Sequence, residues 1–161
     1  PRLMDTDPSF DCLASFQAPA SMDHWEEFNA FVETQADRHL GPGKQSYNLR
    51  LACEELISNI IRHAGDAGSG SSVTLELRSF LSMRDREQTD LIVELTDNGP
   101  FFDPCFETER RIDKELAAAD RPIGGLGLFL VQQSVDQAHY SRNADKNRYR
   151  LTVHLHRSQS P

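Results

Sequence analysis

A long amphipathic helix is predicted around the segment Glu54-Glu55-Leu56-Ile57-Ser58-Asn59-Ile60-Ile61-Arg62-His63-Ala64. Glu55, Asn59 and His63 recur at every fourth position, so they form one polar stripe along a helix that we expect from about residue 44 to 63. A second polar stripe, which includes Glu54, lies about 100° further around the helix. Spacing alone does not separate a solvated face from a ligand-binding face. If the stripe binds a ligand, an Asn carbonyl suits Mg²⁺ and a nearby glutamate can orient or deprotonate an attacking hydroxyl.

A second informative segment begins where a hydrophobic strand ends, at Asp97-Asn98-Gly99-Pro100-Phe101-Phe102-Asp103-Pro104. Asp, Asn, Gly and Pro all favour turns, so an ordinary turn is one interpretation. The functional interpretation is that Asp97 accepts a hydrogen bond from an adenine amino group, while Gly99 lets the ligand approach the backbone closely. The two adjacent phenylalanines in an expected loop favour the functional interpretation.

The third segment is glycine-rich and runs Gly124-Gly125-Leu126-Gly127-Leu128-Phe129-Leu130-Val131. We expect the glycines to precede an apolar helix over about 125–136, whose N-terminal N–H groups would attract phosphate. No Lys-Ser or Lys-Thr follows the glycines, and no strand directly precedes them, so the segment is neither a Walker-type loop nor a Rossmann turn. A flexible hinge is the alternative.

Composition limits the classes of function. The chain has 161 residues and a net charge of −8, which argues against direct nucleic-acid binding, because phosphate neutralisation needs clustered Lys and Arg. No run approaches the roughly 18 apolar residues of a membrane span, and no secretion leader is recognisable, so we expect no membrane association. The three cysteines are far apart, which suits reduced thiols in a cytoplasmic protein. We expect one domain over residues 1–161.

Hydrophobic periodicity predicts a two-layer α/β sandwich. Paired strands suggest a mixed or antiparallel sheet, and we expect a mixed sheet with the helices on one face. The expected strands cover residues 10–17, 73–78, 91–97, 138–142 and 149–155, and the expected helices cover about 21–39, 44–63 and 125–136. The charged segment 106–119 has helical character, and residues 143–147 form a turn.

Taken together, the three segments resemble those of the GHKL (Bergerat-fold) ATP-binding domain, and within it most resemble the anti-sigma-factor serine/threonine kinases. The pattern from Glu55 to Ala64 is similar to the N box of that family, and the pattern from Asp97 to Pro104 is similar to its first glycine box. The glycine-rich segment is similar to the second glycine box, and Asn147-Arg148 before the last strand also fits.

The resemblance implies ATP and Mg²⁺ as ligands. Glu55 would be the catalytic base, Asn59 would bind Mg²⁺, Asp97 would read adenine, and residues 103–123 would form an ATP lid. The full nucleotide-binding set that it implies is Asn59, His63, Asp97, Gly99, Phe102, Gly124, Gly125, Leu126, Gly127 and Leu128.

Members of this family phosphorylate a serine on a small antagonist protein and sequester a sigma factor or comparable target, often as homodimers. The expected function is therefore that of an ATP-dependent protein-serine kinase and anti-sigma-type regulator. The alternative is an ATP-binding module that sequesters a partner without catalysis. The ATP domain of a histidine kinase is a third interpretation, which the lack of a recognisable dimerisation helix with a phosphoacceptor histidine disfavours.

Overall fold

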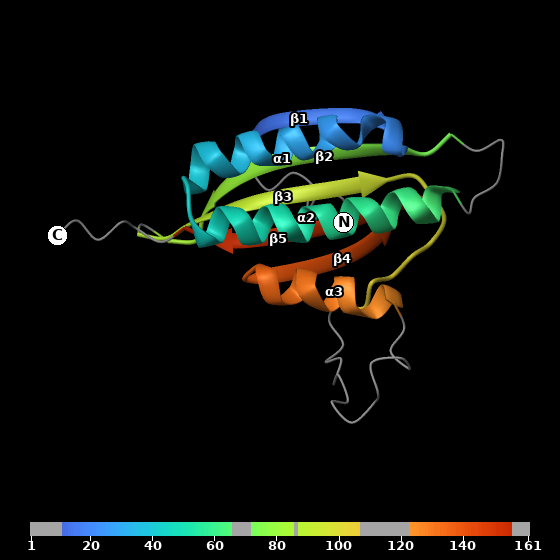
Figure 1. Cartoon of the computed structure of the whole chain (residues 1–161). Helices are drawn as coiled ribbons and strands as arrows, with labels where there is room; N and C mark the ends of the chain where they lie inside the picture. The colour runs from blue at the N-terminus through green and yellow to red at the C-terminus, as the bar shows by residue number, and fades with distance from the viewer. Residues whose placement is uncertain (1–10, 66–71, 86, 107–122, 156–161) are drawn as a thin grey trace, which may run out of the picture.

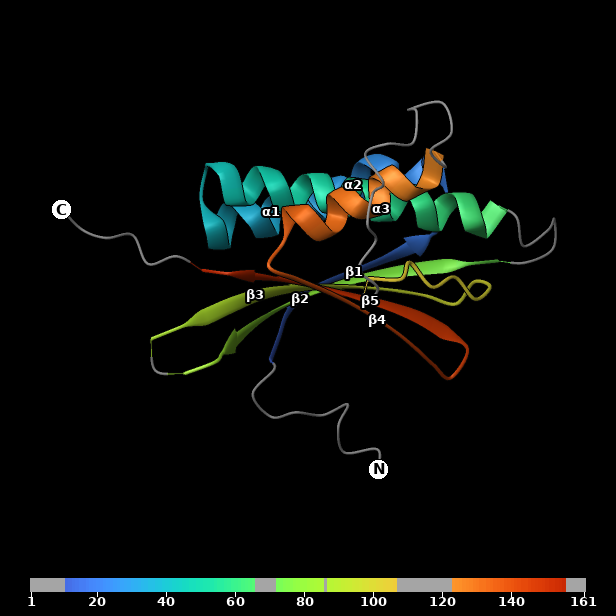
Figure 2. The same ribbon diagram turned by 90° about the horizontal axis from the view of Figure 1, so that it is seen from below.

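The computed structural model describes residues 11–65, 72–85, 87–106 and 123–155. The helices pack on one face of a five-stranded sheet, which makes two layers (Figures 1 and 2). In chain order the elements are β1 (Asp11–Pro19), the short 3₁₀ helix η2 (Met22–His24), α1 (Trp25–Leu40), α2 (Lys44–Gly65), β2 (Thr74–Met83), β3 (Thr89–Asp97), α3 (Ile123–Ser134), β4 (Gln137–Asn143) and β5 (Lys146–His154). This arrangement confirms the predicted two-layer α/β sandwich.

The sheet has the strand order β1-β2-β3-β5-β4, and every neighbouring pair is antiparallel. The expected mixed sheet is therefore corrected to an antiparallel one. The last strand, β5, lies between β3 and β4, so the end of β3 meets the start of β5. In this register Asp97 is the cross-strand partner of Asn147.

The core lies between the sheet and the helices. Leu91, Val93 and Leu95 of β3 are fully buried against it, and α2 contributes Leu56 and Ile57, which are also fully buried. Burial of each such side chain contributes about 2 kcal/mol. A buried hydrogen bond of 2.7 Å from Ser79 Oγ on β2 to Gln35 Oε1 further joins α1 to the sheet. Because Leu56 and Ile57 fix the apolar face of α2 against the sheet, the polar side chains of α2 lie on its other faces.

The opposite face of the sheet carries an ion cluster. Glu94 of β3 is only 1% exposed, and it alternates with Val93 and Leu95 of the core, so it lies on the face of the sheet turned away from the helices. Arg78 of β2 donates to Glu94, and Arg150 of β5 donates to it at 2.9 Å, with Arg148 at 3.6 Å. Because a buried carboxylate is costly without partners, these arginines explain how Glu94 is tolerated at the centre of the sheet.

Several predicted boundaries differ from the structure. α3 begins at Ile123, so the glycine-rich segment lies inside the first turns of the helix rather than before it. β2 continues to Met83, beyond the predicted end at residue 78, and in this extension Ser79 is buried while Leu81 is partly buried against the core. Most of the predicted lid, residues 107–122, and of the predicted helical segment over 106–119 lies outside the described residues. Within the described part of the chain, no helix is both long and apolar enough for a membrane span.

Candidate nucleotide-binding site

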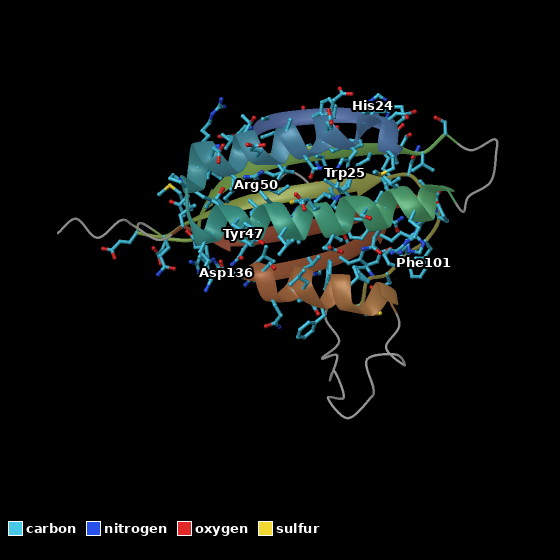
Figure 3. All side chains as sticks on the ribbon, viewed as in Figure 1. His24, Trp25, Tyr47, Arg50, Phe101 and Asp136 are labelled. Carbon is cyan, nitrogen blue, oxygen red and sulfur yellow. The ribbon has the colours of Figure 1, made fainter. Side chains whose placement is uncertain are left out.

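The three informative segments meet at one end of the molecule. This is the end where β3 and α2 finish and α3 and β5 begin, and Figure 3 places the side chain of Phe101 there. α2 and α3 are in direct contact at this end: a Cβ built on Gly127 would lie 2.5 Å from Glu55 Oε2 and 4.0 Å from Asn59 Nδ2. The structure therefore brings the predicted catalytic residue, the predicted metal ligand and the glycine-rich segment together.

Asn59 is held in one orientation on α2. Its side chain is only 4% exposed, and its Nδ2 donates 2.7 Å to the backbone carbonyl of Glu55, one helical turn earlier. Its Oδ1 accepts from Nη2 of Arg62, an exposed residue one turn later. The bond to Glu55 fixes the amide so that its oxygen acts as an acceptor at the polar side of the helix, which is the type of oxygen that Mg²⁺ prefers.

Glu55 and Gly127 fit each other because residue 127 has no side chain. The Glu55 side chain is partly buried and its carboxylate occupies the space that a methyl group at residue 127 would fill. A carboxylate is thus placed beside the first turns of α3, where backbone N–H groups lack partners within the helix. The candidate site thus combines a carboxylate, an amide oxygen and a helix N-terminus, and groups of these kinds suit proton transfer and phosphate binding.

Asp97 ends β3 with its carboxylate turned toward the helix layer. It is 4% exposed, and its Oδ1 accepts from the backbone N–H of Gly99 at 2.9 Å and from Asn147 Nδ2 at 3.0 Å. Neither bond uses Oδ2. Burial raises the pKa of Asp97, while the Asn147 and Gly99 hydrogen bonds and the charge of Arg142 act in the opposite direction. A buried acceptor at a strand end is the arrangement that recognition of an amino group needs.

The loop after Asp97 is close-packed. A Cβ on Gly99 would lie 3.0 Å from Asp97 Oδ1 and 3.3 Å from Val73 Cγ1, so a side chain there would press on the carboxylate. The ring of Phe102 stacks on the ring of His63 at a centroid distance of 3.9 Å, which links this loop to the last turn of α2. Phe101, in contrast, is 66% exposed. Gly99, Phe102 and His63 therefore share one environment with Asp97.

Some of the predicted nucleotide-binding residues can contact a ligand only through their backbone. The side chain of Leu128 is 5% exposed and belongs to the core, so only its backbone is available to a ligand. Gly124, Gly125 and Leu126 belong to the first turns of α3 by their backbone. Any contact of this segment with phosphate would be made by backbone N–H groups.

Some residues of the site were missed as site residues by sequence reasoning. Asn147, Tyr140 and Arg142 reach the loop after Asp97 from β4 and β5, and Arg62 reaches Asn59. Alternation along β4 places Tyr140 and Arg142 on the same face, which was an available signal. The pairing of Asn147 with Asp97 depends on strand register, which local sequence does not show.

The donor set bears on whether Mg²⁺ fits. Among the residues that the structure describes, no group of three or more His, Cys, Asp or Glu side chains could hold a metal by itself. Mg²⁺ commonly takes only one or two protein ligands and completes its shell with water and substrate phosphates. A single oriented Asn59 oxygen beside the Glu55 carboxylate fits that mode, with the nucleotide supplying further oxygens.

Comparison with known proteins agrees with this geometry. Residues 18–153 match the family described as histidine kinase-like ATPase domain, and the chain belongs to that family. The family membership expected from the sequence is thereby confirmed.

The chain is similar in sequence to proteins that are named as serine or serine/threonine kinases. The chain is 27% identical over 124 residues to the serine/threonine-protein kinase BtrW of Bordetella bronchiseptica, covering 77% of this chain and 81% of BtrW. It is 33% identical over 93 residues to the serine-protein kinase RsbW of Listeria monocytogenes, covering 55% of this chain and 54% of that protein. The RsbW of Listeria innocua is 31% identical over the same length. The chain thus spans most of BtrW but about half of RsbW.

Proposed function

We propose that this chain is an ATP-dependent protein-serine kinase that acts as a partner-switching regulator in the bacterial cytoplasm. Its substrate would be a serine on a small antagonist protein, and its other partner a sigma factor or comparable target, with the kinase acting as a homodimer. The observation that carries the proposal is the meeting of Glu55, Asn59 and Gly127 at one point between α2 and α3. Relatives that are named serine kinases support the same activity.

The proposed division of labour follows the two ends of the site. Asp97 with Gly99 and the His63–Phe102 pair would receive the adenine, since they form the buried acceptor and the stacked wall beside it. Asn59 would hold Mg²⁺, and the backbone of the first turns of α3 would face the phosphates. Mg²⁺, when bound, neutralises charge that develops on the phosphate oxygens.

Glu55 is the proposed general base. In the transfer, the Glu55 carboxylate accepts the proton of the substrate serine hydroxyl while a bond forms between the serine oxygen and the γ-phosphorus of ATP. The bond between that phosphorus and the oxygen bridging to the β-phosphate breaks, and ADP leaves with the bonding electrons. Phosphoryl transfer depends mainly on positioning and charge neutralisation, so this small set of groups is sufficient.

The test compares two neighbouring glutamates. Purified wild-type protein, Glu55→Gln and the matched control Glu54→Gln are incubated with radiolabelled ATP and the cognate antagonist protein, which a pull-down from the source cell identifies. Glu55→Gln should bind ATP normally by calorimetry and transfer phosphate at least 100-fold more slowly, in the range by which general bases contribute. Glu54→Gln, on the second polar stripe, should retain the wild-type rate.

Two results would contradict the proposal in different ways. No transfer by the wild type to its cognate antagonist, with ATP binding intact, would indicate a binding module that sequesters its partner without catalysis. Wild-type transfer by Glu55→Gln would keep the kinase but remove Glu55 as its base. Asn59→Ala adds a check on the metal, because it should abolish the Mg²⁺ dependence of ATP affinity while leaving the fold intact.

A further inference from the structure

One buried amide joins the end of β3, the loop that follows it and strand β4. Asn147 is 1% exposed, and its side chain makes five hydrogen bonds. Its Nδ2 donates to Asp97 Oδ1 at 3.0 Å and to the carbonyl of Pro100 at 2.8 Å. Its Oδ1 accepts from the Tyr140 hydroxyl at 2.7 Å and from Arg142 Nη1 at 2.9 Å. The backbone N–H of Phe102 donates to the same oxygen at 3.4 Å. Both donors and both lone pairs of the amide are therefore used.

The chemistry of these partners fixes the direction of the amide. Asp97 Oδ1 and the Pro100 carbonyl can only accept, whereas Arg142 can only donate. A reversed amide would set oxygen against oxygen and N–H against N–H at the same time, and each mismatch of a buried group costs about 1–3 kcal/mol. Asn147 is consequently held in a single orientation by groups from three separate parts of the chain.

We propose that Asn147 is a positioning residue for adenine recognition: it occupies Asp97 Oδ1 and ties down residues 99–102, so that Asp97 Oδ2 is left as the acceptor for the adenine amino group. This inference rests on the proposed function as an ATP-binding protein. It assigns Asn147 no contact with the nucleotide. The Asn147 side chain would act by holding the carboxylate plane and the loop in place before the ligand arrives.

The surroundings support a role beyond general stability. Arg142 also donates to the Gly99 carbonyl at 3.3 Å, and the Tyr149 hydroxyl donates to the Phe102 carbonyl at 3.3 Å. The loop after β3 is thus tied to β4 and β5 through backbone groups at both of its ends, with Asn147 in the middle. Loss of the Asn147 amide would release Asp97 and two loop positions at once, while the core under β3 would stay packed.

The experiment measures base discrimination rather than affinity alone. Dissociation constants for ATP and for inosine triphosphate, which carries an oxygen in place of the 6-amino group, are determined by calorimetry with Mg²⁺ for wild type and Asn147→Ala. The wild type should prefer ATP by at least tenfold. Asn147→Ala should reduce that preference to threefold or less, mainly through weaker ATP binding, because the triphosphate contacts are unchanged.

Two further variants separate positioning from stability. Gln35→Ala removes a buried hydrogen bond on the α1 side of the core, far from Asp97, so it should lower the melting temperature yet keep the ATP preference. Tyr140→Phe removes one donor to Asn147 while retaining the ring that packs on Tyr149 at a centroid distance of 5.4 Å. It should fold and lose part of the preference, and it decides the question if Asn147→Ala does not fold.

The outcomes are distinct. If Asn147→Ala folds and keeps the full preference for ATP, the inference is overturned and the proposed function stands. If Asn147→Ala does not fold, full preference for ATP in Tyr140→Phe has the same meaning. If Gln35→Ala loses the preference as well, discrimination follows stability and the inference also fails. Wild-type protein that binds no ATP overturns the proposed function, and the inference with it.

Discussion

Replacing Gly127 with alanine tests the contact between α2 and α3 most directly. The new methyl group would lie 2.5 Å from Glu55 Oε2, so the carboxylate would have to retreat by about 0.9 Å to reach the 3.4 Å of ordinary contact. The atom that must move is the far end of a flexible side chain, so we expect the fold to survive. Alanine also exceeds glycine in helix propensity by about 1 kcal/mol, which offsets part of the crowding.

The expected effect therefore falls on catalysis. A displacement of about 1 Å at a reacting group can cost on the order of 100-fold in rate. We expect the rate of phosphate transfer to the antagonist at saturating ATP to fall by roughly that factor in Gly127→Ala, with a melting temperature close to that of the wild type. Single-turnover transfer from radiolabelled ATP gives the rate, and thermal denaturation gives the stability.

Gly65→Ala is the matched control, because a Cβ at that position, also in a helix, meets nothing within 4 Å. It should change neither rate nor ATP affinity. Wild-type transfer by Gly127→Ala would refute the claim that the Glu55 carboxylate must sit where it does. A loss confined to ATP affinity would refute it too, since the methyl group would then be acting on the nucleotide instead of on Glu55.

Three further predictions follow from buried charges and thiols. Burial raises the pKa of Asp97 above its ordinary 3.8, so ionised Asp97 costs stability once the pH rises from 3.8 through the raised pKa. Asp97→Asn should therefore be more resistant to urea than the wild type at pH 7, and this gain in stability should shrink toward pH 4. The ATP affinity of the same variant should fall by about tenfold or more. An ATP affinity equal to that of the wild type would contradict the role of Asp97. Glu94→Ala removes the acceptor that the surrounding arginines share and should lower the free energy of unfolding by about 2 kcal/mol. The control Glu76→Ala should change the free energy of unfolding by less than about 0.5 kcal/mol, because the Glu76 side chain is 37% exposed. Equal effects of the two variants in urea titrations would disprove the special role of Glu94. Burial raises the pKa of Cys53 to about 12, so a thiol reagent at pH 8 should modify exposed Cys12 in the native protein but reach Cys53 only after unfolding, and rapid labelling of native Cys53 would show that the core opens.

Local pattern was sufficient for the elements whose periodicity was strong. The apolar spacing along α2 predicted its start at residue 44, and the alternation ending at Asp97 predicted the end of β3. The glycine-rich segment was interpreted as the start of a helix from about residue 125, whereas α3 already starts at Ile123, although glycine disfavours helical backbone. The contact of Gly127 with Glu55 gives a tertiary reason for tolerating a glycine there, and no local pattern contains that information.

The site was only partly predictable for a similar reason. Glu55, Asn59 and Asp97 could be proposed because their segments match known motifs. Asn147 was assigned to a turn, since its neighbours are polar and turn-forming, and its buried amide became apparent only once the β3–β5 register was known. The choice between a mixed and an antiparallel sheet likewise depends on long-range pairing, which the spacing of strands does not determine.

The pairing of Asp97 with Asn147 joins residues that are 50 positions apart, and this has a consequence for how the chain folds. Contacts of such long range must overcome a loop-closure cost before they return any stabilisation, so they tend to form late. In a chain emerging from the ribosome, β3 is complete long before β5, and until β5 arrives the apolar strand Thr89–Asp97 has a free edge on one side. Such an edge can pair with other chains. A nucleotide that binds at Asp97 would therefore favour the chain in which the last strand has already been inserted, and so would protect the protein against misassembly during the final step of folding.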